Sequence, residues 1–197
     1  ILNLTVLAPP GKTIKIPVSC VEAGRWHARS AEFSVAGRAH FSRGRASKAA
    51  QVSESLRSRG TRHSAQGQVW DEISAKSARL KVESPTSAAE AMYDVNRASL
   101  DDYLGGFTAQ QHQVGALFAI NGEAVGFDLF DAASTMEQQL PKLVQSFALD
   151  AIDESLQQPK EHSQNVADSL LQAARGSEIE QFSAVGEGDD LRIQGQG

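Results

Sequence analysis

The feature that most constrains the fold is an Asn-Gly pair between two apolar runs, within residues 114–130. Residues 114–120 read Val-Gly-Ala-Leu-Phe-Ala-Ile, and residues 124–130 read Ala-Val-Gly-Phe-Asp-Leu-Phe. Asn-Gly favours a type I′ turn, because both central residues of that turn need positive φ. The pattern therefore predicts a β-hairpin. Both faces of each strand are apolar, so we expect other elements to cover it. Gly115 and Gly126 carry no side chain, which lets a helix or a ligand approach closely.

Apolar residues at helical spacing predict five helical regions. These are a segment through Ala49, Val52 and Leu56 that ends at Gly60; residues 69–80; residues 87–103, opened by a capping box at Ser87 and Glu90; residues 134–156, with a kink or restart at Pro141; and residues 166–174, ended by Gly176.

Two further hairpins are expected near the ends of the chain. Residues 2–8 and 14–21 alternate around a turn rich in Pro and Gly, and residues 179–185 and 191–193 flank a second polar turn. Residues 24–44 lack a steady period and are expected to form a long loop. Strands at both ends and in the middle, with helices between them, predict an α+β fold. We expect a mixed or mainly antiparallel sheet with packed helices, in a single domain over residues 1–197.

Length and composition bound the class of protein. A chain of 197 residues with 41% hydrophobic residues can bury a sizeable core. No apolar run approaches the ~20 residues of a membrane helix, and the single cysteine excludes an internal disulfide. We expect a cytoplasmic protein without membrane contact. The chain starts without Met and closes where a strand leaves a turn, so we also expect a fragment clipped at both ends.

Charge is distributed unevenly along the chain. Residues 1–70 hold 11 Lys and Arg against 3 Asp and Glu, and the remainder holds 8 against 21. Residues 38–62 hold seven basic residues and a single acid, Glu54. Such a stretch can form a surface for phosphate or nucleic acid. It can also be a solvated face that complements the acidic half of the same domain. We favour the second interpretation, because no aromatic residues are interleaved with the charges as in nucleic-acid motifs.

Two residues are candidates for chemistry. Cys20 lies on the same predicted strand face as Ile16 and Val18, which favours a buried, inert thiol; the alternative is a nucleophile next to Glu22, Arg25 and His27. Asp128 interrupts an apolar strand, and a buried carboxylate needs partners. We expect it to be a structural anchor, for example to an arginine of the basic half. The alternative is a general base with a raised pKa.

The candidate ligand site follows the predicted strand at residues 14–21. Glu22, Arg25 and Trp26 leave that strand together, at the start of a long basic loop. An arginine can clamp a carboxylate or phosphate, and a tryptophan can stack on a ring. A salt bridge beside a packed tryptophan is the alternative. Gln66 and Asp128 are secondary candidates for the same site.

Metal and cofactor motifs are not expected. The five histidines are scattered without ligand spacing. Gly11-Lys12-Thr13 lacks the preceding glycine and the following helix of a phosphate-binding loop. We therefore predict neither a metal ion nor a cofactor.

Several segments together resemble a bacterial family, the ARG and Rhodanese-Phosphatase-superfamily-associated protein domain. The segments are residues 2–7, 16–26, 69–73, 84–86, 113–131, 142–144 and 146–151. The resemblance covers nearly the whole chain. The family has no established activity or catalytic residues to carry over. Its name implies association with ADP-ribosylglycohydrolase-type and phosphatase-like proteins.

Three functional hypotheses remain open from the sequence. The first is an intracellular domain that binds a nucleotide-like or other anionic small molecule, with ADP-ribose suggested only by the family name. The second is a hydrolase that uses Cys20 or Asp128. The third is a nucleic-acid-binding module that uses residues 38–62, which we regard as the weakest. The sequence does not indicate an oligomeric state.

Overall fold

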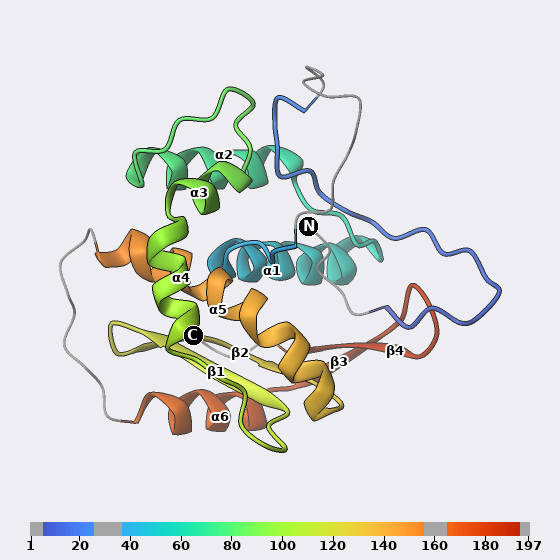
Figure 1. Ribbon diagram of the computed structural model, residues 1–197. Coiled ribbons are helices and arrows are strands. Elements are labelled where there is room, and N and C mark those ends of the chain that lie inside the picture. Colours follow the sequence, from blue (N-terminus) through green and yellow to red (C-terminus); the bar gives the residue numbers. More distant parts are fainter. Residues whose placement is uncertain (1–5, 26–36, 156–164, 194–197) are drawn as a thin grey trace.

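The computed structural model describes residues 6–25, 37–155 and 165–193 (Figure 1). Within these residues, the helices are α1 (Ser42–Arg59), α2 (Gln66–Arg79), α3 (Glu90–Val95), α4 (Arg97–Gly105), α5 (Ala133–Ser155) and α6 (Val166–Gly176). The strands are β1 (Gly115–Ile120), β2 (Glu123–Leu129), β3 (Ile179–Ser183) and β4 (Asp189–Ile193). They form two separate two-stranded antiparallel sheets, so the predicted α+β class is confirmed.

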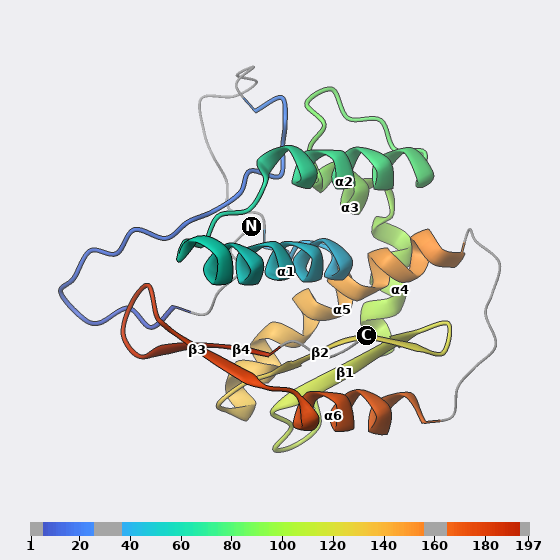
Figure 2. The same cartoon turned by 180° about the vertical axis from the view of Figure 1, so that it is seen from behind.

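Helix α1 lies in the middle of the molecule (Figures 1 and 2). On one side it packs against α2, beside which α3 lies, and on the other side lies the β1–β2 hairpin. Helix α5 contacts α1, α4 and β1, while α6 covers the opposite side of the hairpin and contacts β2. Helices thus lie on both sides of the hairpin, but the expected cover is incomplete, because Phe127 and Leu129 remain 44% and 68% exposed.

The β1–β2 hairpin has the predicted turn. Asn121 and Gly122 have φ angles of 50° and 77°, as a type I′ turn requires. The register pairs Gly115 with Leu129 and shifts by one residue after Phe118. The Phe118 ring stacks on Phe147 of α5, with 3.9 Å between ring centroids. A Cβ at Gly126 would lie 3.4 Å from the Phe147 ring, which is ordinary van der Waals contact, so the approach of α5 does not require a glycine there.

Helix α5 contributes to both apolar cores. Ala148 and Leu149 belong to the larger one, which also holds Phe41 and residues of α2, α3 and α4. Met136, Leu140 and Val144 belong to the smaller one, which packs against the aromatic residues of the hairpin. The helix runs through Pro141 without a restart. Pro141 and Glu137 are both exposed, so water can bond the carbonyl that the proline leaves free.

The predicted N-terminal hairpin is wrong for the described residues. Residues 12–20 are not part of a strand, and Leu7 bridges Glu187 in the turn between β3 and β4. Ile16 and Val18 are 38% and 70% exposed. The alternation of residues 14–21 therefore does not mark a buried face. In place of the local hairpin, Leu7 pairs with Glu187, which is far away in the sequence.

The predicted helix over residues 87–103 is divided into α3 and α4 at Asn96. The Asn96 side chain donates a hydrogen bond to the carbonyl of Met92 at 2.8 Å, where α3 ends. The capping box is also wrong. Ser87 has a φ of 52°, and the Ser84 hydroxyl bonds the N–H of Ala88 in its place. A serine in a turn bonds local backbone as readily as it caps a helix.

Other boundaries agree more closely. The first helix begins at Ser42, about two turns before the expected start, and ends at Gly60 in the left-handed conformation as predicted. The β3–β4 hairpin is confirmed. Across the described residues, no helix combines the length and the apolar character that crossing a membrane requires.

We expect opposite effects from the same substitution at two glycines. Gly122→Ala should destabilise the domain by about 1–2 kcal/mol, because an alanine resists positive φ. Gly67→Ala in α2 should be neutral or stabilise it by up to ~1 kcal/mol, because a Cβ there meets no atom within 4 Å. Chemical denaturation measures both values. Equal effects at the two positions would contradict the assigned turn.

Candidate functional site

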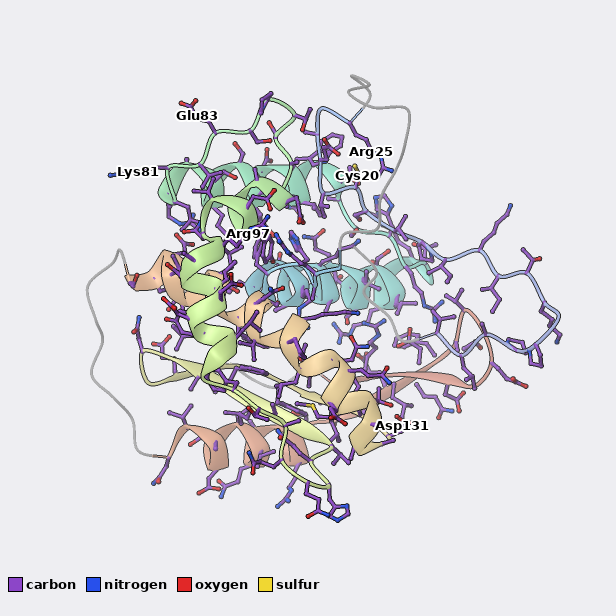
Figure 3. The ribbon with its side chains drawn as sticks, viewed as in Figure 1. Cys20, Arg25, Lys81, Glu83, Arg97 and Asp131 are labelled. Atoms are coloured by element: carbon purple, nitrogen blue, oxygen red, sulfur yellow. The ribbon has the colours of Figure 1, made fainter. Side chains whose placement is uncertain are left out.

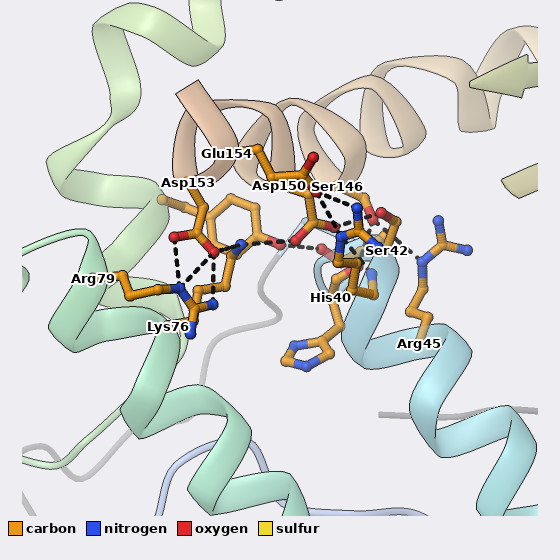
Figure 4. Close-up of polar contacts among 12 residues, drawn as sticks. His40, Ser42, Arg45, Lys76, Arg79, Ser146, Asp150, Asp153 and Glu154 are labelled. Atoms are coloured by element: carbon orange, nitrogen blue, oxygen red, sulfur yellow. Dashed lines mark hydrogen bonds and ion pairs between the residues drawn. The ribbon is translucent and has the colours of Figure 1, made fainter. Parts of the chain in front are cut away.

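A buried network of charges joins α2 to α5 (Figure 4). Lys76 is 2% exposed, and its Nζ lies 2.7 Å from Asp150 Oδ1 and 2.9 Å from Asp153 Oδ2. Arg79 makes a bidentate contact with Asp153, in which Nε lies 2.9 Å from Oδ1 and Nη2 lies 2.7 Å from Oδ2. Burial opposes ionisation of Asp153, but hydrogen bonds from Arg79 and Lys76 lower its pKa below the ordinary value. The ionised carboxylates and the ammonium therefore neutralise one another inside the fold.

The same network fastens the start of α1. Phe41, at the N-cap, offers no side-chain hydrogen bond to the helix. Asp150 Oδ2 takes that role from α5, accepting the Ser42 hydroxyl at 2.5 Å and the Arg43 N–H at 3.0 Å. A carboxylate at a helix N-terminus satisfies free N–H groups and suits the helix dipole. Ser146 completes the attachment by donating to the carbonyl of His40 at 2.6 Å.

Asp128 is an anchor to an arginine of the basic half, as favoured from the sequence. Its Oδ1 lies 3.3 Å from Arg45 Nη1, and Arg45 also donates through Nε to the Ser146 hydroxyl at 3.2 Å. The guanidinium carbon lies 5.3 Å from the centre of the Phe147 ring. The predicted pairing with an arginine is therefore present, but the Asp128 side chain is 25% exposed and not buried as the sequence suggested.

The rest of the basic stretch also pairs with the acidic half. Five of the seven basic residues between positions 38 and 62 form ion pairs with carboxylates from residues 90–190. The pairs are Arg38 with Glu90 and Asp94, Arg43 with Glu154, Arg45 with Asp128, Arg57 with Glu180, and Arg62 with Asp190. The interpretation of a complementary face is confirmed. A nucleic-acid surface loses its main support, because these cations are already neutralised.

A cavity of about 180 Å³ lies beside α1, away from the Lys76 network. Three parts of the chain form its wall: the segment at residues 17–19, the α1 residues Lys48 and Val52, and the connection at residues 62–66 that leads into α2. The connection brings Arg62, His63, Ser64 and Gln66 to the cavity. The Ser19 and Ser64 hydroxyls are hydrogen-bonded to each other at 2.9 Å. The cavity therefore combines basic groups with hydroxyl groups.

The cavity is electropositive. Of the described residues in its wall, none is a carboxylate, whereas Lys48, Arg62 and His63 all carry basic groups. Lys48 is 4% exposed, and burial lowers the pKa of its amine to about 8. Arg62 is held from outside the wall, by Asp190 at 3.0 Å and by the carbonyl of Ser183. Burial opposes ionisation of Asp190, but hydrogen bonds from Arg192 and Arg62 lower its pKa below the ordinary value. Asp190 is therefore an anion, and it holds the Arg62 guanidinium in place.

The structure places the sequence-predicted site residues in different positions. Gln66 lines the cavity, and its side-chain amide pairs with the backbone of Cys20, accepting its N–H at 2.9 Å and donating to its carbonyl at 2.7 Å. Glu22 pairs through its backbone with Ala88, and Arg25 is exposed just after it. Trp26 and His27 lie outside the described residues.

Asp128 belongs to a different region. Figure 3 shows Cys20 and Arg25 beside α2, whereas Asp131, just beyond β2, lies on the other side of α1. Cys20 is half-buried and donates its thiol to the carbonyl of Glu22 at 3.1 Å. The apolar face predicted for it is exposed, so its inertness to thiol reagents stays a prediction.

Sequence reasoning missed Ser19, Ser64 and His63 as site residues, and it placed Lys48 and Arg62 only within a broad basic stretch. These residues share no motif and are separated by up to 45 positions. The one available signal was the lysine among the apolar positions of α1, four residues before Val52. In the described part of the chain, no group of three or more His, Cys, Asp or Glu is placed to hold a metal ion.

The comparison with protein families agrees with the resemblance seen in the sequence. Residues 1–197 match the ARG and Rhodanese-Phosphatase-superfamily-associated Protein domain. The chain belongs to this family. No curated protein and no solved structure shows a significant match. Membership in the family does not assign a ligand to this chain.

Removing the buried ammonium should strongly destabilise the domain. Lys76→Met leaves Asp150 and Asp153 buried without their shared cation, and we expect a loss of about 3–5 kcal/mol in the free energy of unfolding. Arg79→Met is the control, because the Arg79 side chain is 48% exposed and its loss should cost about 1 kcal/mol or less. Denaturant titration measures both. A similar small loss for the two variants would show that the network is not a main source of stability.

Acid should destabilise the domain through His40 before the carboxylates titrate. Burial, aided by nearby positive charges that include Arg45 and Lys48, lowers the pKa of His40 to about 3. Because the unfolded chain binds this proton near pH 6.5, the free energy of unfolding should fall as pH drops from 6.5 towards 3. The slope approaches about 1.4 kcal/mol per pH unit.

The window between pH 6.5 and 4.5 isolates this effect, because Asp153 and Asp190 have lowered pKa values and lose their contribution only at lower pH. His40→Gln should flatten the slope in that window, whereas His112→Asn at an exposed turn should not. An unchanged slope in His40→Gln would contradict the assignment.

Proposed function

We propose that the domain binds a small molecule bearing an anionic group, in the cavity lined by Lys48, Arg62 and His63. The observation that carries this proposal is the convergence of these three basic groups on one cavity whose described wall holds no carboxylate. Four other arginines of the same stretch are matched by acids, whereas Arg62 shares its partner Asp190 with Arg192, which leaves positive charge at the cavity. Buried charged groups bind an anion strongly, because water competes weakly in a low dielectric.

The size of the site favours a ligand with an extended structure, such as a nucleotide-like molecule. A volume of about 180 Å³ suits a phosphate or pyrophosphate group. A wider groove of about 490 Å³ runs along α1 and shares His63 and Ser64 with the cavity. Gln51, Glu54 and Gln68 lie along this groove and provide hydrogen-bonding groups. A phosphate group in the cavity and a polar ring system in the groove would use both spaces. ADP-ribose is one molecule of this type.

The sequence-predicted site is a neighbour of this cavity. Gln66 belongs to the wall of the cavity and also holds the backbone at Cys20, two residues before Glu22. Arg25 therefore follows closely along the same segment. The two sites make different demands on the chain: a ligand in the cavity needs Lys48, whereas a ligand at the sequence-predicted site needs Arg25.

Calorimetric titration with pyrophosphate, ADP and ADP-ribose tests the proposal. Lys48→Met should weaken binding by about 10-fold to 100-fold, because a hydrogen bond to a charged group contributes roughly 1.5–3 kcal/mol. Lys12→Met changes an exposed lysine and should leave the affinity unchanged. Loss of binding in Arg25→Ala with retention in Lys48→Met would move the site to the sequence-predicted position. Absence of binding by all three compounds would overturn the proposal.

A further inference from the structure

We propose that Lys48 captures a carbonyl compound that also carries a carboxylate or phosphate, forming an imine in the cavity. This inference rests on the proposed function, because the same cavity must first hold the anionic group. It adds covalent chemistry to that site. The compounds of this class include 2-oxo acids, aldehyde acids and ring-opened sugar phosphates.

The placement of Lys48 is that of a reactive amine. The side chain leaves the buried face of α1, four residues before Val52, which is 2% exposed, and it reaches a cavity large enough for a small molecule. Lysines become nucleophiles when burial or a neighbouring cation favours the neutral amine. At pH 7, an amine with a pKa of about 8 is roughly 10% neutral, whereas an exposed lysine is neutral well below ~0.1% of the time. Lys48 therefore presents neutral amine at ordinary pH.

Lys76, the other buried lysine among the described residues, provides the contrast. Lys76 is enclosed by Asp150 and Asp153, which keep its ammonium charged. Lys48 instead faces Arg62, His63 and the Ser19–Ser64 hydroxyl pair. Of these two lysines, both among the described residues, one is built into an ion network with carboxylates and the other lines a cavity with basic and hydroxyl groups. Only the second arrangement suits capture of an anionic substrate.

The step itself is balanced by groups in the cavity. The neutral Lys48 nitrogen attacks the carbonyl carbon, a C–N bond forms, and the carbonyl oxygen takes a proton to give a carbinolamine. Loss of that oxygen as water then forms the C=N bond. Arg62 would hold the carboxylate or phosphate of the compound. The Ser19 and Ser64 hydroxyls line the same cavity and can both donate and accept, so they are the groups available to hydrogen-bond the carbinolamine oxygen.

Reductive trapping with glyoxylate tests the inference. Glyoxylate with cyanoborohydride at pH 7 converts a lysine that forms the imine into carboxymethyl-lysine, and peptide mass spectrometry locates it. We expect Lys48 to react at least about 10-fold faster than the exposed Lys12 in the same protein. Formaldehyde is the uncharged control, and with it the advantage of Lys48 over Lys12 should be several-fold smaller. An equal advantage with both aldehydes would overturn the requirement for an anionic group.

Two further measurements keep the result interpretable. Pyrophosphate should slow glyoxylate modification of Lys48 but not of Lys12, which requires no variant and so avoids any folding defect. Arg62→Gln should reduce the glyoxylate reaction at Lys48 and leave the formaldehyde reaction nearly unchanged. If pyrophosphate binds in calorimetry but Lys48 reacts no faster than Lys12, anion binding stands and imine capture is wrong. If neither occurs, both proposals fail.

Discussion

The ion network around Lys76 is the interaction on which the arrangement of helices depends. One ammonium group holds two carboxylates of α5, and one of those carboxylates also caps α1, so a single buried centre fixes three helices relative to one another. The oxygens of Asp150 and Asp153 are all engaged. A buried charge network is favourable only when every member has its hydrogen-bond partners. Here the cations of α2 find their partners on α5, and the carboxylates of α5 find theirs on α2 and α1. The position of α1 that results also decides where Lys48 points.

Charge pairing between the two halves of the chain shapes the surface. The basic first third and the acidic remainder neutralise each other through arginines on or beside α1, and these pairs bind the β1–β2 hairpin, α5 and the β3–β4 hairpin to that helix. Most of the uneven charge in the sequence therefore serves ion pairs within the fold and not binding of an external partner. At the cavity lined by Lys48 and Arg62, the carboxylate of Asp190 is shared between Arg62 and Arg192, so positive charge remains there.

The cavity and its reactive amine follow from the same packing. Lys48 is buried because α1 is covered by the segment at residues 17–19 and by the connection into α2, and burial in turn favours its neutral form. Gln66 closes this arrangement by bonding the backbone of Cys20 as a neighbouring strand would. Binding of an anion and nucleophilic chemistry are thus two consequences of one desolvated site, and they differ only in whether the ligand carries a carbonyl group.

The sequence by itself determined the α+β class, the hairpin at Asn121 and Gly122 and the end of α1 at Gly60. These depend on short-range backbone preferences, which are readable from neighbouring residues. Only the tertiary structure decided that residues 14–21 pair with no adjacent strand, that Asp150 caps α1 from 107 residues away, and that Ser19, Lys48 and Arg62 meet at one cavity. Such contacts join segments far apart in the chain, and their partners are chosen by packing and by the satisfaction of buried charge, which no local pattern encodes.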